Sequence, residues 1–531
     1  MAFEKHARTI TLLTLLSRFT GLARDAAQSR VFGGGPVMDA FALAFQVPNL
    51  FRRLFGEGAL TASFTPIYAR LEQSDPVAAR RFAGTLVCLL AILLAGITLL
   101  GEMVLAQLPT ATPDQSLTVR LTALMLPYMP MVCVVALLGG ILGVHGRFGQ
   151  AAFSPIILNL AIVGGCMLVW LVPGAGASSD RARIGWVAMA VLVAGAVQLA
   201  WMAWSLRGVG VRPALAVRAD RQPLGQVLRS MAPTMLGLAA FQINVLLDSL
   251  IASYPTTIGP TILGVPFPLD QGSNATLNWA ARLYEFPLGV FGLPVATAIF
   301  PLLARQASDP RALLHSLRRG IRMVAFLGVP ASVGLMLVAQ PLAAAVYQGG
   351  RCGPEEVSRI ATVLVAFAPA VAAYCTIHLL VRALYAMGDL GTPSRITAGL
   401  VGLNLVINLT LIFTPLGLSG LAWSTSFCAF VNVALLWRAL GKRVGRLLDD
   451  VLWRSLAKTM VATAVMGVVV VGVGQALPVG DAWGTQVLRL AVLASVGGAT
   501  VFGAARWLHM PEWRWAIGRG DAEPVATDLA P

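Results

Sequence analysis

The sequence predicts an all-α polytopic membrane protein, and three observations lead to this class. The chain has 531 residues, of which 57% are hydrophobic and only 12% charged, with a mean hydropathy of +0.76. Apolar runs long enough to cross a bilayer as helices recur along the whole chain. Basic residues gather in alternate connections between these runs, as in membrane proteins with positively charged cytoplasmic loops. No separate soluble domain is expected.

The apolar runs predict about fourteen membrane-spanning helices. They are expected near residues 9–31, 36–56, 82–107, 120–145, 152–172, 184–206, 227–250, 276–301, 320–346, 358–386, 394–413, 417–439, 455–476 and 486–506. Every second loop carries Arg or Lys, whereas the stretch 253–276 has no basic residue at all. Both termini are therefore expected in the cytoplasm, which requires an even number of helices, and the loop 253–275 is expected on the periplasmic side.

The net charge of +15, from 39 Lys and Arg against 24 Asp and Glu, would suggest a nucleic-acid partner in a soluble protein. Here the excess fits the positive cytoplasmic loops, so no nucleic acid is expected. The six cysteines form no CxxC motif, and the sequence has no Walker loop, HExxH motif or nucleophile elbow. These features predict a protein that is not an enzyme and needs no cofactor.

The first apolar segment carries charges that lipid does not tolerate. Residues 9–32 read TITLLTLLSRFTGLARDAAQSRVF and include Arg18, Arg24 and Asp25. An Arg at the centre of a lipid-facing helix costs about 2.5–3.5 kcal/mol on insertion scales. These side chains are therefore expected to face the protein interior or a water-filled cavity, with Arg18 and Asp25 nearly in line along the helix. A cationic cavity wall favours an anionic cargo.

The second segment combines an acid, a proline and two arginines. Asp39 lies near its outer end, and Pro48 removes a helical hydrogen bond, which predicts a kink. Asn49 and Arg52 share one helix face at i, i+3, so Arg52 is expected to point into the protein. Arg53 fits a solvated cytoplasmic anchor, and Asp39 fits a cap at the membrane boundary as well as it fits a binding residue.

A later segment, near 276–301, places an ion pair beside helix-breaking residues. Arg282 and Glu285 are one turn apart and can face one cavity, or they can simply neutralise each other at the outer boundary. A bent or broken helix is predicted by the residues that follow: Pro287, Gly289, Gly292 and Pro294. Such a break is tolerated within a membrane only against protein or a cavity.

A group of oxygen-bearing side chains is the one candidate for an ion site. Asp248 is a lone acid in its apolar segment, Asn404 and Asn408 are spaced at i, i+4, and Thr425 follows in the next segment. Carboxylate, amide and hydroxyl oxygens can bind a hard cation such as Na⁺. Hydrogen bonding between helices is the alternative, and a single formal charge makes any Na⁺ site weak.

A weak internal repeat suggests how the helices are grouped. GRFGQAAFSPIILNL (146–160) and YAMGDLGTPSRITAGLVGLNL (385–405) share a Gly-containing turn, a Pro near the start of a helix and a later Asn, six helices apart. Transporters often arise by such duplications. We therefore expect an N-terminal lobe of six helices at 1–225, a C-terminal lobe at 226–445, and two added helices with a cytoplasmic tail at 446–531.

The segment SRFTGLARDAAQSRVFGGGPVMDAFALAFQVPNLFRRLFGEGALTASFTPIYA (17–69) closely resembles the opening of the MurJ (MviN) lipid II flippases, which belong to the multidrug/oligosaccharidyl-lipid/polysaccharide exporter superfamily. The resemblance continues in RLYEFPLGVFGLPVATAIFP (282–301) and RALYAMGDLGTPSRI (382–396), and it spans the chain. It implies a bacterial inner-membrane protein that works as a monomer and moves lipid II to the periplasmic leaflet by alternating access of two lobes.

The resemblance also implies roles for particular residues. The family's cavity arginines, which bind the anionic headgroup, correspond to Arg18, Arg24, Arg52 and Arg282, and the helices at 455–476 and 486–506 correspond to a groove for the polyprenyl tail. We predict a substrate-binding set of Arg18, Arg24, Asp25, Asp39, Arg52, Arg282 and Glu285, with Pro48, Pro287, Gly289 and Gly292 as gating or kink positions. The sequence departs from the family at two positions: Ala281 stands where many relatives have Asp, and Gln46 replaces a family Lys.

Two other functions remain open at this stage. A cation-coupled drug exporter of the same superfamily would have twelve helices and an acidic, aromatic cavity, whereas this sequence predicts a basic one. A flippase for another polyprenyl-linked glycan would share the arginines. In every case the cargo and the surrounding membrane lipids are the expected partners.

Overall fold

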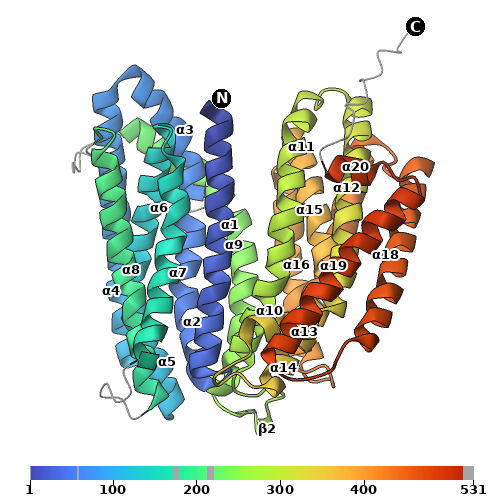
Figure 1. The fold of residues 1–531 in the computed structure, drawn as a ribbon. Coiled ribbons are helices and arrows are strands. Elements are labelled where there is room, and N and C mark those ends of the chain that lie inside the picture. The colour runs from blue at the N-terminus through green and yellow to red at the C-terminus, as the bar shows by residue number, and fades with distance from the viewer. Residues whose placement is uncertain (1, 57–58, 172–178, 212–220, 518–531) are drawn as a thin grey trace. The chain divides into compact units, whose positions relative to one another are not determined.

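The computed structural model describes residues 2–56, 59–171, 179–211 and 221–517, and these are almost entirely helical (Figure 1). The helices are α1 (Ala2–Phe32), α2 (Pro36–Phe51), the π-helical turn η1 (Arg52–Gly56), α3 (Ala59–Ser74), α4 (Pro76–Gln107), α5 (Pro113–Met125), α6 (Tyr128–Val144), α7 (Phe148–Leu171), α8 (Asp180–Arg207), α9 (Arg221–Thr257), α10 (Ser273–Pro287), the π-helical turn η2 (Leu288–Gly292), α11 (Leu293–Arg305), α12 (Pro310–Leu337), α13 (Ala339–Tyr347), α14 (Pro354–Phe367), α15 (Pro369–Ala386), α16 (Gly391–Leu411), α17 (Ser419–Val444), α18 (Asp450–Ala476), α19 (Trp483–Trp507) and α20 (Glu512–Ala516). Strands β1 (Thr261–Ile262) and β2 (Val265–Pro266) form an antiparallel hairpin.

The predicted class, a polytopic all-α membrane protein, is confirmed, but the count of fourteen spans is not. Every predicted range overlaps a helix, yet eleven helices within the described residues are long and apolar enough to cross a membrane. The three predicted ranges outside this set are 9–31, 36–56 and 227–250. All three contain charged residues that the sequence singled out, and α2 is also interrupted by η1 after 16 residues.

Two predicted loops are shorter than expected. Helix α9 continues to Thr257 and α10 begins at Ser273, so the loop predicted at 253–275 spans 258–272 and carries the β1–β2 hairpin. Residues 59–74, which the sequence left between two spans, form the helix α3. The basic positions Arg212 and Arg218, and the expected tail beyond residue 517, lie outside the described residues.

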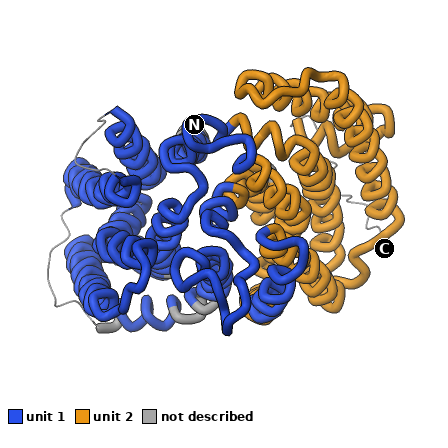
Figure 2. The backbone as a smooth tube through the Cα atoms, turned by 90° about the horizontal axis from the view of Figure 1, so that it is seen from below, with its two compact units in different colours: residues 1–279, 346–357, 401–418 blue, residues 280–345, 358–400, 419–531 orange. Residues whose placement is uncertain are grey.

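The chain divides into two compact units, which Figure 2 colours separately. Unit 1 comprises residues 1–279, 346–357 and 401–418. In it α1 packs along α7, α7 packs on α8, and α2 packs on α5 (Figure 1). Its interior is built from apolar side chains such as Phe64, Tyr68, Met129 and Ile141, all essentially inaccessible to solvent. The segment 346–357 runs from the end of α13 into the start of α14 and contacts the turn between α1 and α2 within unit 1.

This junction depends on backbone and side-chain hydrogen bonds. The Arg351 N–H donates to the Arg30 carbonyl at 2.9 Å, and the Gly34 N–H donates to Glu356 Oε1 at 2.9 Å. The Ser29 hydroxyl donates to the Tyr347 carbonyl at 3.2 Å. Because these groups lie at the ends of helices, where backbone donors and acceptors have no partner within the helix, the bonds fix the α1–α2 turn.

Unit 2 comprises residues 280–345, 358–400 and 419–531. Helix α12 packs on α15 and α18, and α18 packs on α19. Helices α12, α18 and α19 together enclose an apolar cluster that includes Phe326, Met466, Val470 and Leu493. A short polar anchor closes it: Glu512 of α20 is buried and accepts from Arg322 Nε at 2.7 Å and from the Ser455 hydroxyl at 2.5 Å.

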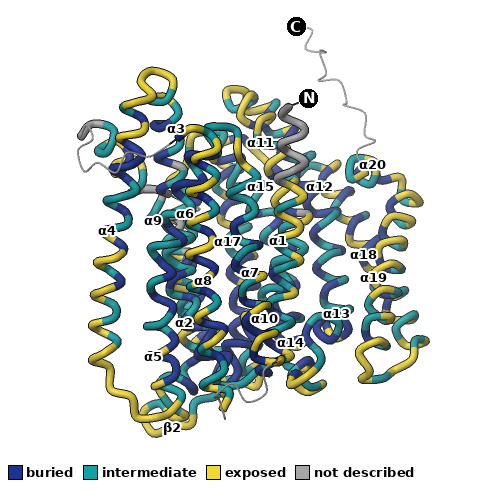
Figure 3. Tube along the Cα trace, turned by 60° about the vertical axis from the view of Figure 1, so that its left-hand side comes forward, coloured by how far each residue is buried: buried dark blue, intermediate teal, exposed yellow. Residues whose placement is uncertain are grey.

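Apolar side chains also cover outward faces of the long helices. Ile92, Leu93, Leu99, Leu100 and Met103 of α4 are each more than half exposed, and Figure 3 shows exposed residues along this helix. A continuous apolar face of this size on a water-soluble protein would be an aggregation site, whereas lipid tails solvate it. The chain is therefore a multi-pass membrane protein.

One glycine in the connection before α10 is required by a close backbone approach. Gly272 has φ +89°, and a Cβ there would lie 1.9 Å from the Gly34 carbonyl oxygen, which is backbone and cannot rotate away. Gly264, at the hairpin turn, has a similar φ of +82° but no atom within 4 Å of such a Cβ. The two positions share the left-handed backbone conformation and differ in packing.

We expect Gly272→Ala to lower the free energy of unfolding by more than about 2 kcal/mol, because it adds a backbone clash to the left-handed strain. Gly264→Ala should cost about 1 kcal/mol, because it carries the strain alone. Denaturant unfolding of both purified variants in mixed micelles measures the difference. Equal losses would show that the contact between Gly272 and Gly34 is not the constraint.

Candidate functional site

Two neighbouring charged residues of α1 form an ion pair that is largely shielded from solvent. Arg24 Nε and Nη2 donate to Asp25 Oδ1 at 2.8 and 2.6 Å, and the two side chains are only 12% and 7% exposed. Adjacent residues on a helix point about 100° apart, so the long Arg24 side chain reaches around to its neighbour. The pair carries no net charge, which lowers the cost of placing it in a membrane helix.

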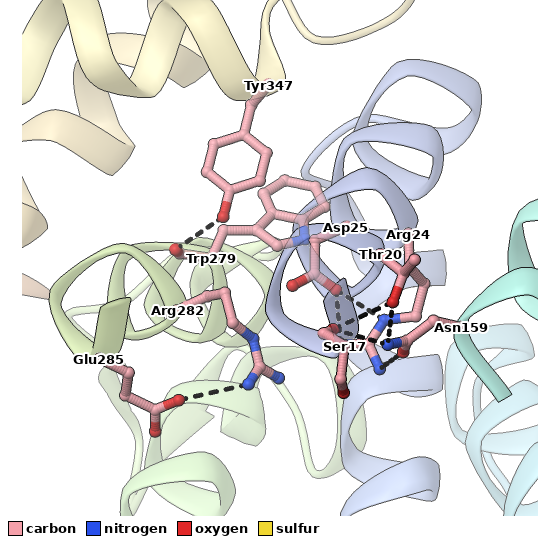
Figure 4. A network of polar contacts seen from close by, with 9 residues as sticks. All are labelled: Ser17, Thr20, Arg24, Asp25, Asn159, Trp279, Arg282, Glu285 and Tyr347. Carbon is pink, nitrogen blue, oxygen red and sulfur yellow. Dashed lines mark hydrogen bonds and ion pairs between the residues drawn. The ribbon is translucent and has the colours of Figure 1, made fainter. Parts of the chain in front are cut away.

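An amide from α7 completes the environment of Arg24 (Figure 4). Asn159 Oδ1 accepts from Arg24 Nη1 at 3.2 Å, and its Nδ2 donates to the Ser17 carbonyl and to the Thr20 hydroxyl, both at 3.2 Å. Asn159 is buried. Arg18 lies one and a half turns before Arg24 on the same helix and is half-buried. Sequence reasoning placed the arginines on this helix but missed the partner on α7.

The second arginine of the predicted set lies where α2 changes geometry. Arg52 Nε and Nη2 donate to Asn49 Oδ1 at 2.9 and 2.8 Å, as the i, i+3 spacing suggested. The helix runs through Pro48 and becomes a π-helix at Arg52, four residues later. Arg53 Nη1 donates to Gln242 Oε1 of α9 at 3.4 Å and is half-buried, so its side chain is less solvated than expected.

In unit 2, the predicted pair Arg282 and Glu285 is present at 3.2 Å, and both side chains are about 40% exposed (Figure 4). Helix α10 ends at Pro287 and passes directly into η2, which contains Gly289 and Gly292. A Cβ at Gly292 would lie 2.8 Å from Cys375 Sγ of α15. Glycine therefore lets this π-helical turn lie close against α15.

Asp39 differs most from its predicted role. It is fully buried at the start of α2, and its carboxylate accepts from the Thr256 hydroxyl at 2.8 Å and from the backbone N–H groups of Gly272 and Ala275 at 2.6 and 2.9 Å. Asn274 Nδ2 also donates to the Asp39 carbonyl at 3.4 Å. Thr256 belongs to α9, Gly272 ends the connection that follows it, and Asn274 and Ala275 begin α10. This arrangement favours a structural role, in which Asp39 joins α2 to the segment that precedes Arg282.

The candidate ion-binding oxygens form a hydrogen-bonded cluster between α9 and α16. Asn408 Nδ2 donates to Asp248 Oδ1 at 2.6 Å and to Asn404 Oδ1 at 2.9 Å, and Asn244 Nδ2 donates to Asp248 Oδ2 at 3.4 Å. Asn408 Oδ1 is buried without a hydrogen-bond partner. Thr425 belongs to unit 2, where its hydroxyl donates to the Leu421 carbonyl. Within the described ranges, no group of three or more His, Cys, Asp or Glu side chains could hold a metal ion.

The fold and the site describe a multi-pass helical membrane protein with π-helical turns and with partly buried arginines in its helices. A solved MurJ lipid II flippase in an inward closed conformation matches with a TM-score of 0.77 at 18% identity, over 94% of this chain and 98% of that one. An inward-facing MATE family transporter of the MOP superfamily matches with a TM-score of 0.65 at 15% identity, over 83% of this chain and 98% of that one.

Sequence comparison identifies the family. The family model described as lipid II flippase MurJ matches residues 28–489. A probable lipid II flippase MurJ of Vibrio cholerae is 31% identical over 86% of each chain, and the lipid II flippase MurJ of Burkholderia cenocepacia is 30% identical over 82% of this chain and 83% of that one. The chain belongs to the MurJ family.

We expect Asp39→Ala to lower the free energy of unfolding by about 3 kcal/mol or more, because it leaves two backbone N–H groups and a hydroxyl buried without an acceptor. Asp75 provides a control, since it also accepts two backbone N–H groups, as the exposed cap of α4. Asp75→Ala should cost about 1 kcal/mol. Denaturant unfolding of both purified variants in mixed micelles without lipid II measures the two losses of stability. Unchanged stability of Asp39→Ala combined with weaker lipid II binding would place Asp39 in the binding site instead.

Proposed function

We propose that this chain moves lipid II, the polyprenyl-diphosphate-linked peptidoglycan precursor, from the cytoplasmic to the periplasmic leaflet of the bacterial inner membrane. Membership of the MurJ family supports the cargo. The observation that carries the proposal is Arg24, a guanidinium buried in a membrane helix beside a single carboxylate. A side chain that is costly to place in lipid is retained where it serves a polar cargo.

The chemistry of Arg24 suits a diphosphate. Of its five N–H groups, three donate to Asp25 and Asn159, which leaves two for a ligand. A guanidinium stays charged when it is desolvated, and its planar fork matches phosphate oxygens. Arg18, Arg52 and Arg282 would supply further contacts to the headgroup, with Asp25 and Glu285 orienting the arginines beside them.

Alternating access of the lobes 1–225 and 226–445 would expose these residues to each side of the membrane in turn. The π-helical turns η1 and η2 are suited to the bending this requires, because π geometry inserts a residue into the helical hydrogen-bond pattern. The polyprenyl tail would stay in the bilayer beside α18 and α19. Apolar side chains on α18, including Met460, Val465 and Val468, are exposed and can contact it.

The cluster of Asp248, Asn404 and Asn408 has one formal charge and one unpaired buried oxygen. These features fit a polar link between helices that could also hold Na⁺ weakly. We infer that the chain works as a monomer without catalysis, with both termini in the cytoplasm. A flippase for another polyprenyl-linked glycan would use the same diphosphate chemistry, so the identity of the accumulating lipid decides between them.

The proposed topology predicts that the β1–β2 hairpin faces the periplasm. Leu263 at its turn is fully exposed, whereas Ser273 is buried and a poor position for labelling. Leu263→Cys should react with a membrane-impermeant maleimide in intact spheroplasts. Cysteine at Ser74, an exposed residue at the opposite, basic side, should react only after permeabilisation. The reverse pattern would overturn the orientation.

Loss of the chain should make lipid II accumulate in the cytoplasmic leaflet, and the wild-type gene should reverse this. Alanine at Arg18, Arg24, Arg52 or Arg282 should abolish the rescue while the protein persists in the membrane, because each removes a phosphate-binding cation.

Asp248→Asn should impair the rescue less than Arg24→Ala does. If cells that carry only Arg24→Ala grow, Arg24 does not belong to the binding site. If lipid II flipping depends steeply on Na⁺ and Asp248→Asn abolishes that dependence, the cluster is the site of a driving ion.

A further inference from the structure

Asn159 holds three groups of α1 with one buried amide (Figure 4). Its oxygen accepts from Arg24 Nη1, and its nitrogen donates to the Ser17 carbonyl and to the Thr20 hydroxyl. The amide lies over Gly21, where a Cβ would be 3.6 Å from Nδ2. Small residues at such crossings let helices approach closely, and polar side chains then bond across them. Asn159 therefore fixes α7 against the part of α1 that leads to Arg24.

The contacts of Arg24 come from two directions. Asp25 accepts from Nε and Nη2, along one edge of the guanidinium. Asn159 accepts from Nη1, the nitrogen outside that edge. Asp25 is the neighbour of Arg24 on the same helix, so it neutralises the guanidinium without tying it to another element. Asn159 is the contact that ties it to a second helix. With both present, the plane of the guanidinium and the direction of its two remaining N–H groups are set.

The geometry points to Asn159 as a positioning residue for the cargo: it holds the Arg24 guanidinium so that the free N–H groups face the diphosphate of lipid II. This inference rests on the proposed function. A polar recognition group needs a rigid surrounding shell, because a misdirected donor loses most of its binding energy. Asn159 also leaves the charge of Arg24 intact, whereas a second carboxylate there would compete with the phosphate.

The test is equilibrium binding of fluorescent lipid II to the purified full chain. Asn159→Ala should weaken binding about tenfold, the value of one hydrogen bond to a charged group. Gln198 of α8 is a matched control: it is equally buried, accepts from the Tyr128 hydroxyl and donates to the Ser154 carbonyl, without contacting Arg24. Gln198→Ala should change lipid II affinity less than about twofold even where it lowers stability as much.

A double-mutant cycle separates positioning from general packing. In an Arg24→Ala background, Asn159→Ala should cause no further loss of affinity, because its effect passes through Arg24. If Asn159→Ala fails to fold, Asn159→Asp takes its place, because it keeps the size of the side chain and the acceptor for Arg24. It should weaken lipid II binding at least tenfold when Arg24 is present and not when Arg24 is replaced, because the new carboxylate neutralises the guanidinium further. Equal effects of Asn159→Ala and Gln198→Ala, or additive losses in the cycle, would overturn the inference.

The outcomes also distinguish this inference from the proposed function. If Arg24→Ala binds lipid II as tightly as the wild type, the proposed role of Arg24 fails. If Arg24→Ala loses binding while both Asn159 variants retain it, the proposed function stands and Asn159 is only a packing residue.

Discussion

A guanidinium in a membrane-spanning helix must be neutralised and hydrogen-bonded by the protein itself, because the bilayer offers neither charge nor water. Arg24 meets this requirement through Asp25 on its own helix and Asn159 on α7. The contact with Asn159 also fixes where α7 crosses α1, and Gly21 leaves space for it. The hydrogen bonds of Arg24 therefore determine part of the packing of α1 on α7.

The π-helical turns extend this constraint to the backbone. Each follows a proline, Pro48 or Pro287, whose missing N–H already weakens the helical pattern. One further residue in a turn rotates the following helix by about 100° relative to a continuous α-helix. The face presented by α11 is thus set by η2, which runs directly into it. An uninterrupted helix of the same composition would turn different side chains toward its neighbours.

Hydropathy and the distribution of Arg were enough to predict the fold class, since lipid demands long apolar helices whatever their order. The cost of charge in lipid likewise singled out Arg24 and Asp25. Asn159 could not be found in this way, because an Asn in an apolar run has many potential partners until the register of α1 on α7 is known. The sequence left Asp39 open between a cap and a binding residue for a related reason: its donors lie 217 to 236 residues away. Whether the arginines of the two units share one cavity stays a prediction.

The distance along the chain between Asp39 and its donors has a consequence for synthesis. Gly272, which donates to the carboxylate, is 233 residues further on. At about 5–20 residues per second, the ribosome needs on the order of 10 to 50 seconds to make that segment. During this interval the chain from α3 to α9 is made, while a carboxylate destined for burial lacks its backbone donors. It must be kept hydrated or protonated at the insertion machinery, so the first helices cannot reach their final packing until α9 and the start of α10 arrive.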